Sequence, residues 1–216
     1  MSKTLLQLTN EVLILLREEQ VTATSDNVTS ALVASFVKQA AREVESAWKW
    51  LQLRQTISLD TAADTYAYVL TGAGESFKIL SVFEDTTDTT LDKAYSYDWM
   101  NEQLLANNPA TGVPLFYDIN GTSGGDPVMN VTPIPDAAYN LYVNLVVHTE
   151  FDTDSTSTAA PWMPIVKRAY ILSLQERGDD GGNDLVVLHN EYINMLADAI
   201  AIEAGTYQTE VAWYEE

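Results

Sequence analysis

Two glycine-rich stretches and two histidines are the residues whose types could most readily do chemistry. TGAGES at 71–76 lacks the Gly-Lys-Ser/Thr ending of a phosphate-binding loop, and GTSGGD at 121–126 lacks the spacing of a nucleophile elbow. His148 and His189 stand far apart in a chain without cysteine and without an HExxH motif. We interpret the glycines as turns and the histidines as surface or packing residues, while a Ser-His-Asp triad assembled in space stays open.

Carboxylates are the second set of residues that could do chemistry. A glycosidase uses a pair of them, but among 31 Asp and Glu residues nothing singles out two. Asp152, Asp154 and the acids at 85–92 could touch a divalent cation, yet neither group has the spacing and glycine of a calcium-binding loop. We interpret them as solvated acidic loops and predict no catalytic residue, no metal and no cofactor.

The net charge of −20 is unevenly distributed along the chain. Residues 1–50 carry six acids and five bases, whereas 51–160 have a net charge of −12 and 161–216 of −7. Because no basic stripe is available to grip phosphates, a protein that binds nucleic acid by charge attraction is disfavoured.

Aromatic residues mark two candidate contact regions. Trp48, Trp50 and Leu51 end a helical pattern just before the sequence turns strand-like. We predict that they pack between a helical bundle and a β-rich segment rather than stack on a ligand. Tyr207, Trp213 and Tyr214 lie in an acidic tail beyond the last helix stop, where we interpret them as anchors for a partner.

Four segments have helical periodicity, two at each end of the chain. The N-terminal stretch is broken by polar residues and reads as a helix rather than a signal peptide. Pro161 begins the third helix, and Asn183 caps the fourth. The predicted core faces are Leu5, Leu8, Val12, Leu15 and Leu16 in the first helix; Val28, Leu32, Phe36, Ala40, Val44 and Ala47 in the second; and Leu185, Leu188, Tyr192, Met195, Leu196 and Ala199 in the fourth.

Between the helical ends, residues 52–149 alternate in the manner of strands, with one short helix before Pro109. In VTPIPDAAYNLYVNLVV at 131–147, the two prolines belong in a connection, and Leu141, Val143, Leu145 and Val147 face a core. Residues 150–161 have the composition of a linker. No uninterrupted apolar run is long enough to span a bilayer, so we predict no membrane association.

The order of elements predicts an α+β fold, because runs of helix and strand do not alternate. We expect a helical bundle made of 1–51 and 161–205, an inserted β-rich domain of antiparallel sheet or sandwich type at 52–160, and a tail at 206–216.

Several motifs occur in one order. They are A-x-R-E-V-x-x-x-W-x-W-L at 40–51, T-Y-x-Y-x-L at 65–70, G-x-P-x-x-Y-x-I at 112–119, V-T-P-I-P-D-A-A-Y-x-L-x-V at 131–143 and P-W-M-P at 161–164. In this order they resemble the head-to-tail adaptor proteins of short-tailed bacteriophages, the connector or tail tubular type, over residues 4–200.

The resemblance implies a structural virion protein, not an enzyme, with a helical bundle and a β domain. Such adaptors form rings, commonly of twelve copies, in the virion neck, after assembly in the host cytoplasm. They join the portal protein to a tail or nozzle protein, and DNA passes through the lumen without specific binding. On this reading Tyr207, Trp213 and Tyr214 contact the portal or a neighbouring copy.

The acidity then has a possible mechanism. Twelve copies at −20 each would carry about −240 together, and acids lining the lumen would repel DNA phosphates close to the wall. Two alternatives stay open: a phage-borne carbohydrate-active hydrolase that uses two carboxylates, and a sugar-binding β module that carries helices.

Overall fold

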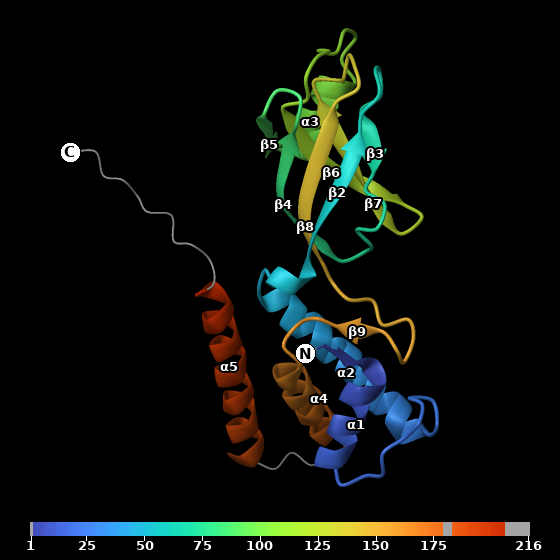
Figure 1. The fold of residues 1–216 in the computed structure, drawn as a ribbon, viewed down its shortest axis with the longest axis vertical. Helices are drawn as coiled ribbons and strands as arrows, with labels where there is room; N and C mark the ends of the chain where they lie inside the picture. The colour runs from blue at the N-terminus through green and yellow to red at the C-terminus, as the bar shows by residue number, and fades with distance from the viewer. Residues whose placement is uncertain (1, 179–182, 206–216) are drawn as a thin grey trace, which may run out of the picture. The chain divides into compact units, whose positions relative to one another are not determined.

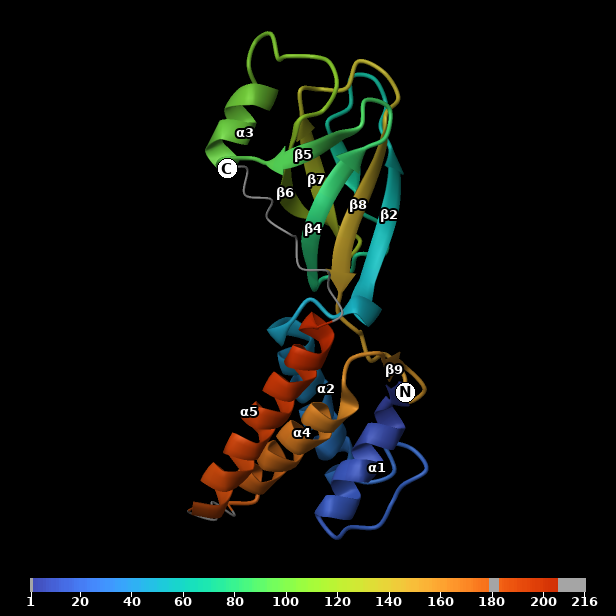
Figure 2. The ribbon, with the colours of Figure 1, turned by 60° about the vertical axis from the view of Figure 1, so that its left-hand side comes forward.

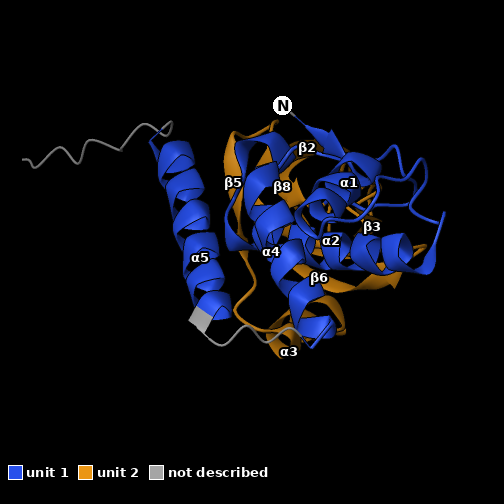
Figure 3. Ribbon diagram, turned by 90° about the horizontal axis from the view of Figure 1, so that it is seen from below, with its two compact units in different colours: residues 1–53, 149–216 blue, residues 54–148 orange. Residues whose placement is uncertain are grey.

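The computed structural model describes residues 2–178 and 183–205. It divides the chain into two compact units, which Figure 3 colours separately. Unit 1 consists of Met1–Leu53 and Thr149–Glu216, and unit 2 of Arg54–His148. Helices dominate the first and a large curled mixed sheet the second, so the predicted α+β class is confirmed.

Helices α1 (Leu5–Leu15) and α2 (Val28–Ala47) begin at capping boxes of their own sequence. The Thr4 hydroxyl accepts from the backbone N–H of Gln7, whose side chain accepts from the N–H of Thr4. Asn27 and Ser30 exchange the same pair of bonds at the start of α2. These caps satisfy N–H groups that have no partner within a helix, which is why both helices start at these residues.

The buried faces of α1 and α2 differ in part from the sequence prediction. Leu15 is 46% exposed, and Leu13 is buried in its place. Val28 and Leu32 are exposed, whereas Val33 and Val37 lie in the core. The predicted stripe on α2 advanced four residues at a time, which rotates it by about 40° per step in a helix of 3.6 residues per turn. That stripe therefore winds from the exposed side at residue 28 onto the buried side at Ala40 and Val44, which both are in the core.

Helices α4 (Trp162–Glu176) and α5 (Asn183–Ala204) complete the described part of unit 1. Helix α4 packs against α1 and α2, and α5 packs on α4, so the two run side by side in Figures 1 and 2. Pro161 precedes the first residue of α4, as expected for a proline at a helix start. The predicted inner face of α5 is correct, since Tyr192 is buried and the other five residues are partly buried.

Residues 149–160, expected with the β-rich segment, belong instead to unit 1, and we call them the strap. The strap carries β9 (Ser157–Thr158), which pairs antiparallel with β1 (Lys3–Thr4). The buried Glu45 carboxylate of α2 accepts from the Thr149 backbone N–H at 2.8 Å and from the Thr158 hydroxyl at 2.6 Å. A segment with linker composition is thus held in place because its hydroxyls and amides meet a buried acid.

Unit 2 is a seven-stranded sheet with the order β2-β8-β4-β5-β6-β7-β3. Its strands are labelled in Figure 1. All neighbouring strands are antiparallel except β5 and β6, which are parallel. The strands are β2 (Arg54–Asp60), β3 (Ala67–Val69), β4 (Phe77–Glu84), β5 (Thr89–Lys93), β6 (Phe116–Ser123), β7 (Asp126–Thr132) and β8 (Asn140–Val147). The parallel step follows from helix α3 (Tyr97–Leu104), which lies between β5 and β6 in the sequence and supplies the crossover.

The core of unit 2 lies along β8 and its neighbours. Leu141, Val143 and Leu145 are fully buried, and Val147 is partly buried, as their alternation predicted. Residues 133–139, which include both prolines, form the connection from β7 to β8, also as predicted. A two-residue turn at Gly124 and Gly125 joins β6 to β7 with φ of +65° and +93°, a conformation that glycine adopts without steric cost.

Candidate functional site

The glycine-rich stretches and His148 lie in unit 2, and His189 lies in unit 1, where each makes local contacts. The backbone N–H groups of Gly72 and Gly74 donate to the Asp126 carboxylate at 3.1 and 2.9 Å, which closes a turn. The Nδ1 atom of His148 lies 2.5 Å from the Ser76 hydroxyl. His189 is exposed on α5, beside the Tyr192 ring. The Ser76–His148 pair belongs to neighbouring strand ends and has no third triad member in the described contacts.

The acidic loops hold their own backbone. Asp154 of the strap accepts from the Thr24 N–H at 2.9 Å and from its hydroxyl, which ties the strap to the loop before α2. Glu84, fully buried at the end of β4, accepts from the N–H groups of Thr86 and Thr87, each at 2.7 Å. Within residues 2–178 and 183–205, no three His, Cys, Asp or Glu residues converge as metal ligands would.

Four carboxylates in the described ranges have a shifted pKa, and all four are shifted downward. They are Asp26, Glu43, Glu84 and Asp154. Burial alone would raise the pKa of Glu84, but hydrogen bonds from Thr87 and Thr86 outweigh it and lower that pKa. A glycosidase acid needs the opposite shift, because it must carry a proton at neutral pH. These carboxylates are kept ionised by structural hydrogen bonds.

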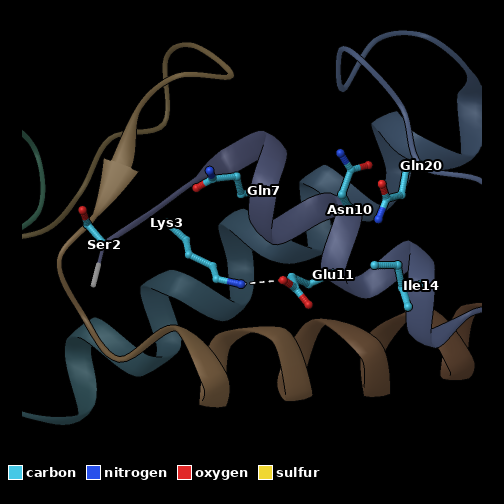
Figure 4. Close-up of a pocket in the computed structure, with 7 residues that line it drawn as sticks. All are labelled: Ser2, Lys3, Gln7, Asn10, Glu11, Ile14 and Gln20. Carbon is cyan, nitrogen blue, oxygen red and sulfur yellow. Dashed lines mark hydrogen bonds and ion pairs between the residues drawn. The ribbon is translucent and has the colours of Figure 1, made fainter.

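Figure 4 shows a hollow of about 410 Å³ beside α1, lined by polar side chains. Four of its polar side chains, those of Lys3, Gln7, Asn10 and Glu11, form hydrogen bonds within unit 1. Lys3 pairs with Glu11, and its Nζ also lies 3.7 Å from the centre of the Trp162 ring. The Asn10 amide both donates to and accepts from the Val21 backbone at 2.9 Å. The hollow is therefore a groove between structural contacts and offers no converging catalytic groups.

The aromatic residues at the end of α2 have different roles inside unit 1. Trp50 is fully buried, and its indole N–H donates to the Val44 carbonyl at 2.8 Å. Leu51 is 49% exposed, and its backbone N–H donates to the Glu203 carboxylate of α5. Trp48 is partly buried. Packing of these three residues between the two units stays a prediction.

The three tail residues proposed as anchors, Tyr207, Trp213 and Tyr214, lie outside the described residues. Their contact with a portal or a neighbouring copy also stays a prediction.

A surface that the sequence reading missed lies along α5. We call it the α5 outer face, and it consists of Asp184, Val186, Val187, Asn190, Ile193, Ala197, Asp198 and Ala201, all of them exposed. Val186 and Val187 are 59% and 53% exposed, and Ile193 is 48% exposed. Exposed apolar side chains along a helix are frequent at surfaces that contact other molecules.

The second missed surface is an aromatic cluster on unit 2. Trp99 of α3 packs edge-on against Tyr95, with ring centres 5.2 Å apart, and against Phe116 of β6, at 5.1 Å. Tyr95 is 80% exposed, and nearby Leu115 is 44% exposed. Alternate aromatics in Y-S-Y-D-W at 95–99 were the sequence signal that could have indicated it. Trp and Tyr are the residues that most often anchor protein contacts.

The described residues thus present two exposed surfaces with apolar or aromatic side chains, the α5 outer face and the aromatic cluster on unit 2. The family model described as "SU10 adaptor protein" matches residues 3–216, nearly the whole chain. The protein belongs to the SU10 adaptor protein family. The resemblance to head-to-tail adaptors, inferred from the ordered motifs, is confirmed, and the protein is a structural adaptor.

The chain was also compared with curated protein sequences and with solved structures. No curated protein sequence matches the chain. A solved structure described as "Neck of empty GTA particle computed with C6 symmetry" is similar at 12% identity, over 79% of this chain and 76% of that one. The TM-score of the two structures is 0.26.

Helix α5 also qualifies the prediction of no membrane association. Residues Asp184–Ala204 are long and apolar enough to cross a membrane by length and composition, with a mean hydropathy of 1.2. Only 6% of the apolar stretch within these residues is buried inside the protein. The sequence-based prediction rested on the absence of an uninterrupted apolar run. Helix α5 has no such run, but its mean hydropathy is high because only a few polar residues are spread among apolar ones.

Proposed function

We propose that the protein is a ring-forming head-to-tail adaptor in the virion neck, which joins the portal to a tail or nozzle protein and leaves a channel for DNA. The observation that carries this proposal is the family match over residues 3–216. The exposed α5 outer face and the aromatic cluster on unit 2 support it, because a subunit of a ring needs surfaces for its neighbours. By the resemblance, twelve copies assemble in the host cytoplasm.

The experiment is to mix the full chain with portal rings of the phage that encodes it and to image the mixture by electron microscopy. We expect an added ring at one end of the portal. Portal rings that stay bare at saturating protein, together with turnover of a polysaccharide, would contradict the proposal. The portal must be present, because assembly proteins often stay monomeric until a partner nucleates them.

The proposed channel lets DNA pass without gripping it. With 31 acids and 11 bases, the subunit repels phosphates wherever acids face the lumen. The repulsion acts only close to the wall, because the Debye length is about 8 Å at physiological salt. We expect the assembled ring to show no retention of duplex DNA in a mobility assay at low salt. A ring structure with a neutral or basic lumen would refute this part of the proposal.

The aromatic cluster favours one alternative function, sugar binding by unit 2. Exposed Tyr95 and partly buried Trp99 are the kind of rings on which a sugar face stacks. Calorimetric titration of the full chain with host surface polysaccharide, alongside Trp99→Ala, separates the readings. Binding that Trp99→Ala removes would favour a sugar-binding module, and release of reducing ends would favour a hydrolase. No heat of binding is expected for an adaptor.

A further inference from the structure

Helix α5 packs against the described part of unit 1 through one of its sides. Its inner side carries buried Tyr192, over which the Arg168 guanidinium of α4 lies at 5.8 Å, and buried Glu203, which accepts from Leu51. The α5 outer face lies on the opposite side of the helix, where no described element covers it. Figure 3 shows α5 at the margin of unit 1. An isolated helix gains little stability without packing, so a long apolar face left open calls for a partner.

The α5 outer face carries charge along one edge. Asp184, Glu191 and Asp198 are seven residues apart, which places them within about 40° of one another around the helix. Glu191 pairs with Lys167 of α4. Asp184 and Asp198 have no ion pair in the part of the chain that the structure describes. The described part of α5, Asp184–Ala204, contains no lysine or arginine. The surface is therefore an apolar strip beside an acidic edge.

Helix α2 has an exposed surface of opposite charge. We call it the α2 outer face, and it consists of Val28, Ala31, Leu32, Ser35, Lys38 and Arg42, all of them exposed. Val28 is 86% exposed and Leu32 is 37% exposed. Lys38 and Arg42 are one turn apart and form no ion pair with the described acids. Two acids of the same helix do not neutralise this face, because Glu43 pairs with Arg168 and Glu45 is buried. Asp154 of the strap interacts electrostatically with Lys38.

We propose that the α5 outer face packs on the α2 outer face of a second copy of this chain, with Asp198 opposite Lys38 and Arg42. Asp184 lies about 21 Å further along α5 and extends the acidic edge beyond these two bases. The proposal rests on the proposed ring function and names the surfaces that join neighbouring subunits. Each face alone exposes apolar side chains and side-chain charges of one sign. Together they bury the apolar side chains and pair the charges.

A single copy cannot satisfy this contact by itself. The side of α2 that faces α4 and α5 carries Glu43, whose carboxylate accepts from Arg168 Nε at 2.5 Å. Arg42 is the next residue along the helix, and it therefore points about 100° away from Glu43. The α2 outer face thus lies away from α5 of the same copy. A contact between two different faces is head-to-tail, and such contacts close into a ring when the rotation between copies permits.

A lipid bilayer is the main competing occupant of α5. The helix has the length and mean hydropathy of a membrane span. Three acids lie on its solvent side, however, and acidic side chains are costly in hydrocarbon. The absence of lysine and arginine also removes the residues that draw a surface helix to anionic headgroups. The charge pattern therefore favours a protein partner with bases.

The chain has no cysteine, so single cysteines can report the contact without background. Full-length Asp198→Cys and Arg42→Cys are purified separately, mixed, and treated with a short bis-maleimide over a range of protein concentrations up to saturation. We expect a dimer band in the mixture that neither variant yields alone. A dimer from Asp198→Cys alone would mean a symmetric contact, and no band at any concentration, with or without portal rings, would mean no contact; either result overturns the proposal.

Charge exchange tests the pairing itself. Sedimentation of Asp184→Lys/Asp198→Lys is expected to show association at least about tenfold weaker than wild type, and Lys38→Glu/Arg42→Glu the same. An equimolar mixture of the two double variants is expected to form heterodimers through the exchanged charges. Asp85→Lys/Glu102→Lys in unit 2 changes the net charge equally and should leave association unchanged. A loss of the same size in this control, or no heterodimer in the mixture, would refute the pairing.

Two further readouts separate this inference from its rivals. Flotation of the wild-type chain with phosphatidylcholine vesicles, abolished by Ile193→Asp, would assign α5 to a membrane and overturn the proposal. If rings form on the portal but the Asp198 and Arg42 cysteines never cross-link, the adaptor function stands and the proposed interface is wrong. If no ring forms and the portal stays bare while the cross-link appears, the interface stands and the adaptor function is wrong.

Discussion

Strand β8 and helix α5 are both apolar segments, but the protein covers them to very different extents. On β8, Leu141, Val143 and Leu145 are fully buried, and strands β2 and β4 pair with it on both edges. On α5, Val186 is 59% and Ile202 is 75% exposed, and α4 is the helix that packs on it.

The difference follows from where each element finds its backbone hydrogen bonds. A central strand depends on its neighbours for every N–H and C=O group, so it must be enclosed by its own unit before it is stable. A helix satisfies its backbone internally, so one side can stay open to another molecule without unpaired polar groups. The core strand of unit 2 is therefore enclosed by its own neighbours, whereas unit 1 keeps one face of a helix exposed.

The largest expected effect is a loss of stability on truncating a buried side chain of the enclosed strand β8. Leu145→Ala removes a fully buried side chain from β8 and leaves a cavity, so it should lower the free energy of unfolding by about 2–5 kcal/mol. Urea denaturation measures the loss. Val69→Ala, at a position 39% exposed on β3, serves as the control and should change stability by about 0.5 kcal/mol. Equal losses in the two variants would mean that β8 is not enclosed.

A smaller effect concerns the strap of unit 1, which a buried carboxylate holds in place. Glu45→Gln weakens the bonds to the Thr149 N–H and the Thr158 hydroxyl, and it should destabilise the protein by about 1–3 kcal/mol. Hydrogen exchange should show faster exchange of the Thr149 amide. Ser46→Ala, an exposed neighbour on the same helix, should leave that amide protected. An unchanged exchange rate in Glu45→Gln would mean that other contacts hold the strap.

A pH-dependent effect sharpens the comparison within unit 2. Because the folded-state pKa of Glu84 is lowered below its ordinary value of 4.5, its ionised form stabilises the fold at neutral pH. That contribution is lost as the pH falls through the folded pKa. Glu84→Gln should therefore cost about 1–2 kcal/mol at pH 7, and the gap to wild type should narrow in acid. Urea denaturation midpoints from pH 7 to pH 3 measure the difference in stability between the variant and wild type, with exposed Asp85→Asn as control. A constant gap would argue against the pKa shift.

The smallest expected effect on stability concerns the exposed face of helix α5. Ile193→Ala on the α5 outer face should change the stability of the free subunit by about 0.5 kcal/mol or less, because its side chain is 48% exposed. Its neighbour Tyr192 is buried, and Tyr192→Ala should cost clearly more. Thermal melting of the two adjacent variants makes a matched pair. Equal destabilisation would mean that α5 has no open face.

Periodicity predicted one side of α5 correctly and half of α2 incorrectly. The inner residues of α5, such as Leu185 and Tyr192, were found because a 3.6-residue pattern keeps them on one side. On α2, steps of four residues drifted around the helix and included exposed Val28 and Leu32. The strap was read as a linker because composition does not reveal that its Thr and Asp side chains bond to distant residues.

The candidate surfaces could be predicted only in part. Trp50 was singled out from its position at a helix end, and it is buried, although its packing against unit 2 stays a prediction. The aromatic cluster was missed because Phe116 lies seventeen residues after Trp99 in the sequence, and only the crossover through α3 brings their rings together.

The sequence by itself determined the local elements, their order and the family, because caps, prolines, alternation and ordered motifs act over short stretches of chain. Only the tertiary structure decided which apolar residues remain uncovered. Exposure depends on which distant element packs on each face, and two apolar sides of one helix look alike until a neighbour covers one of them. For α5 that neighbour is α4, and the side left open is the one that we assign to a second copy.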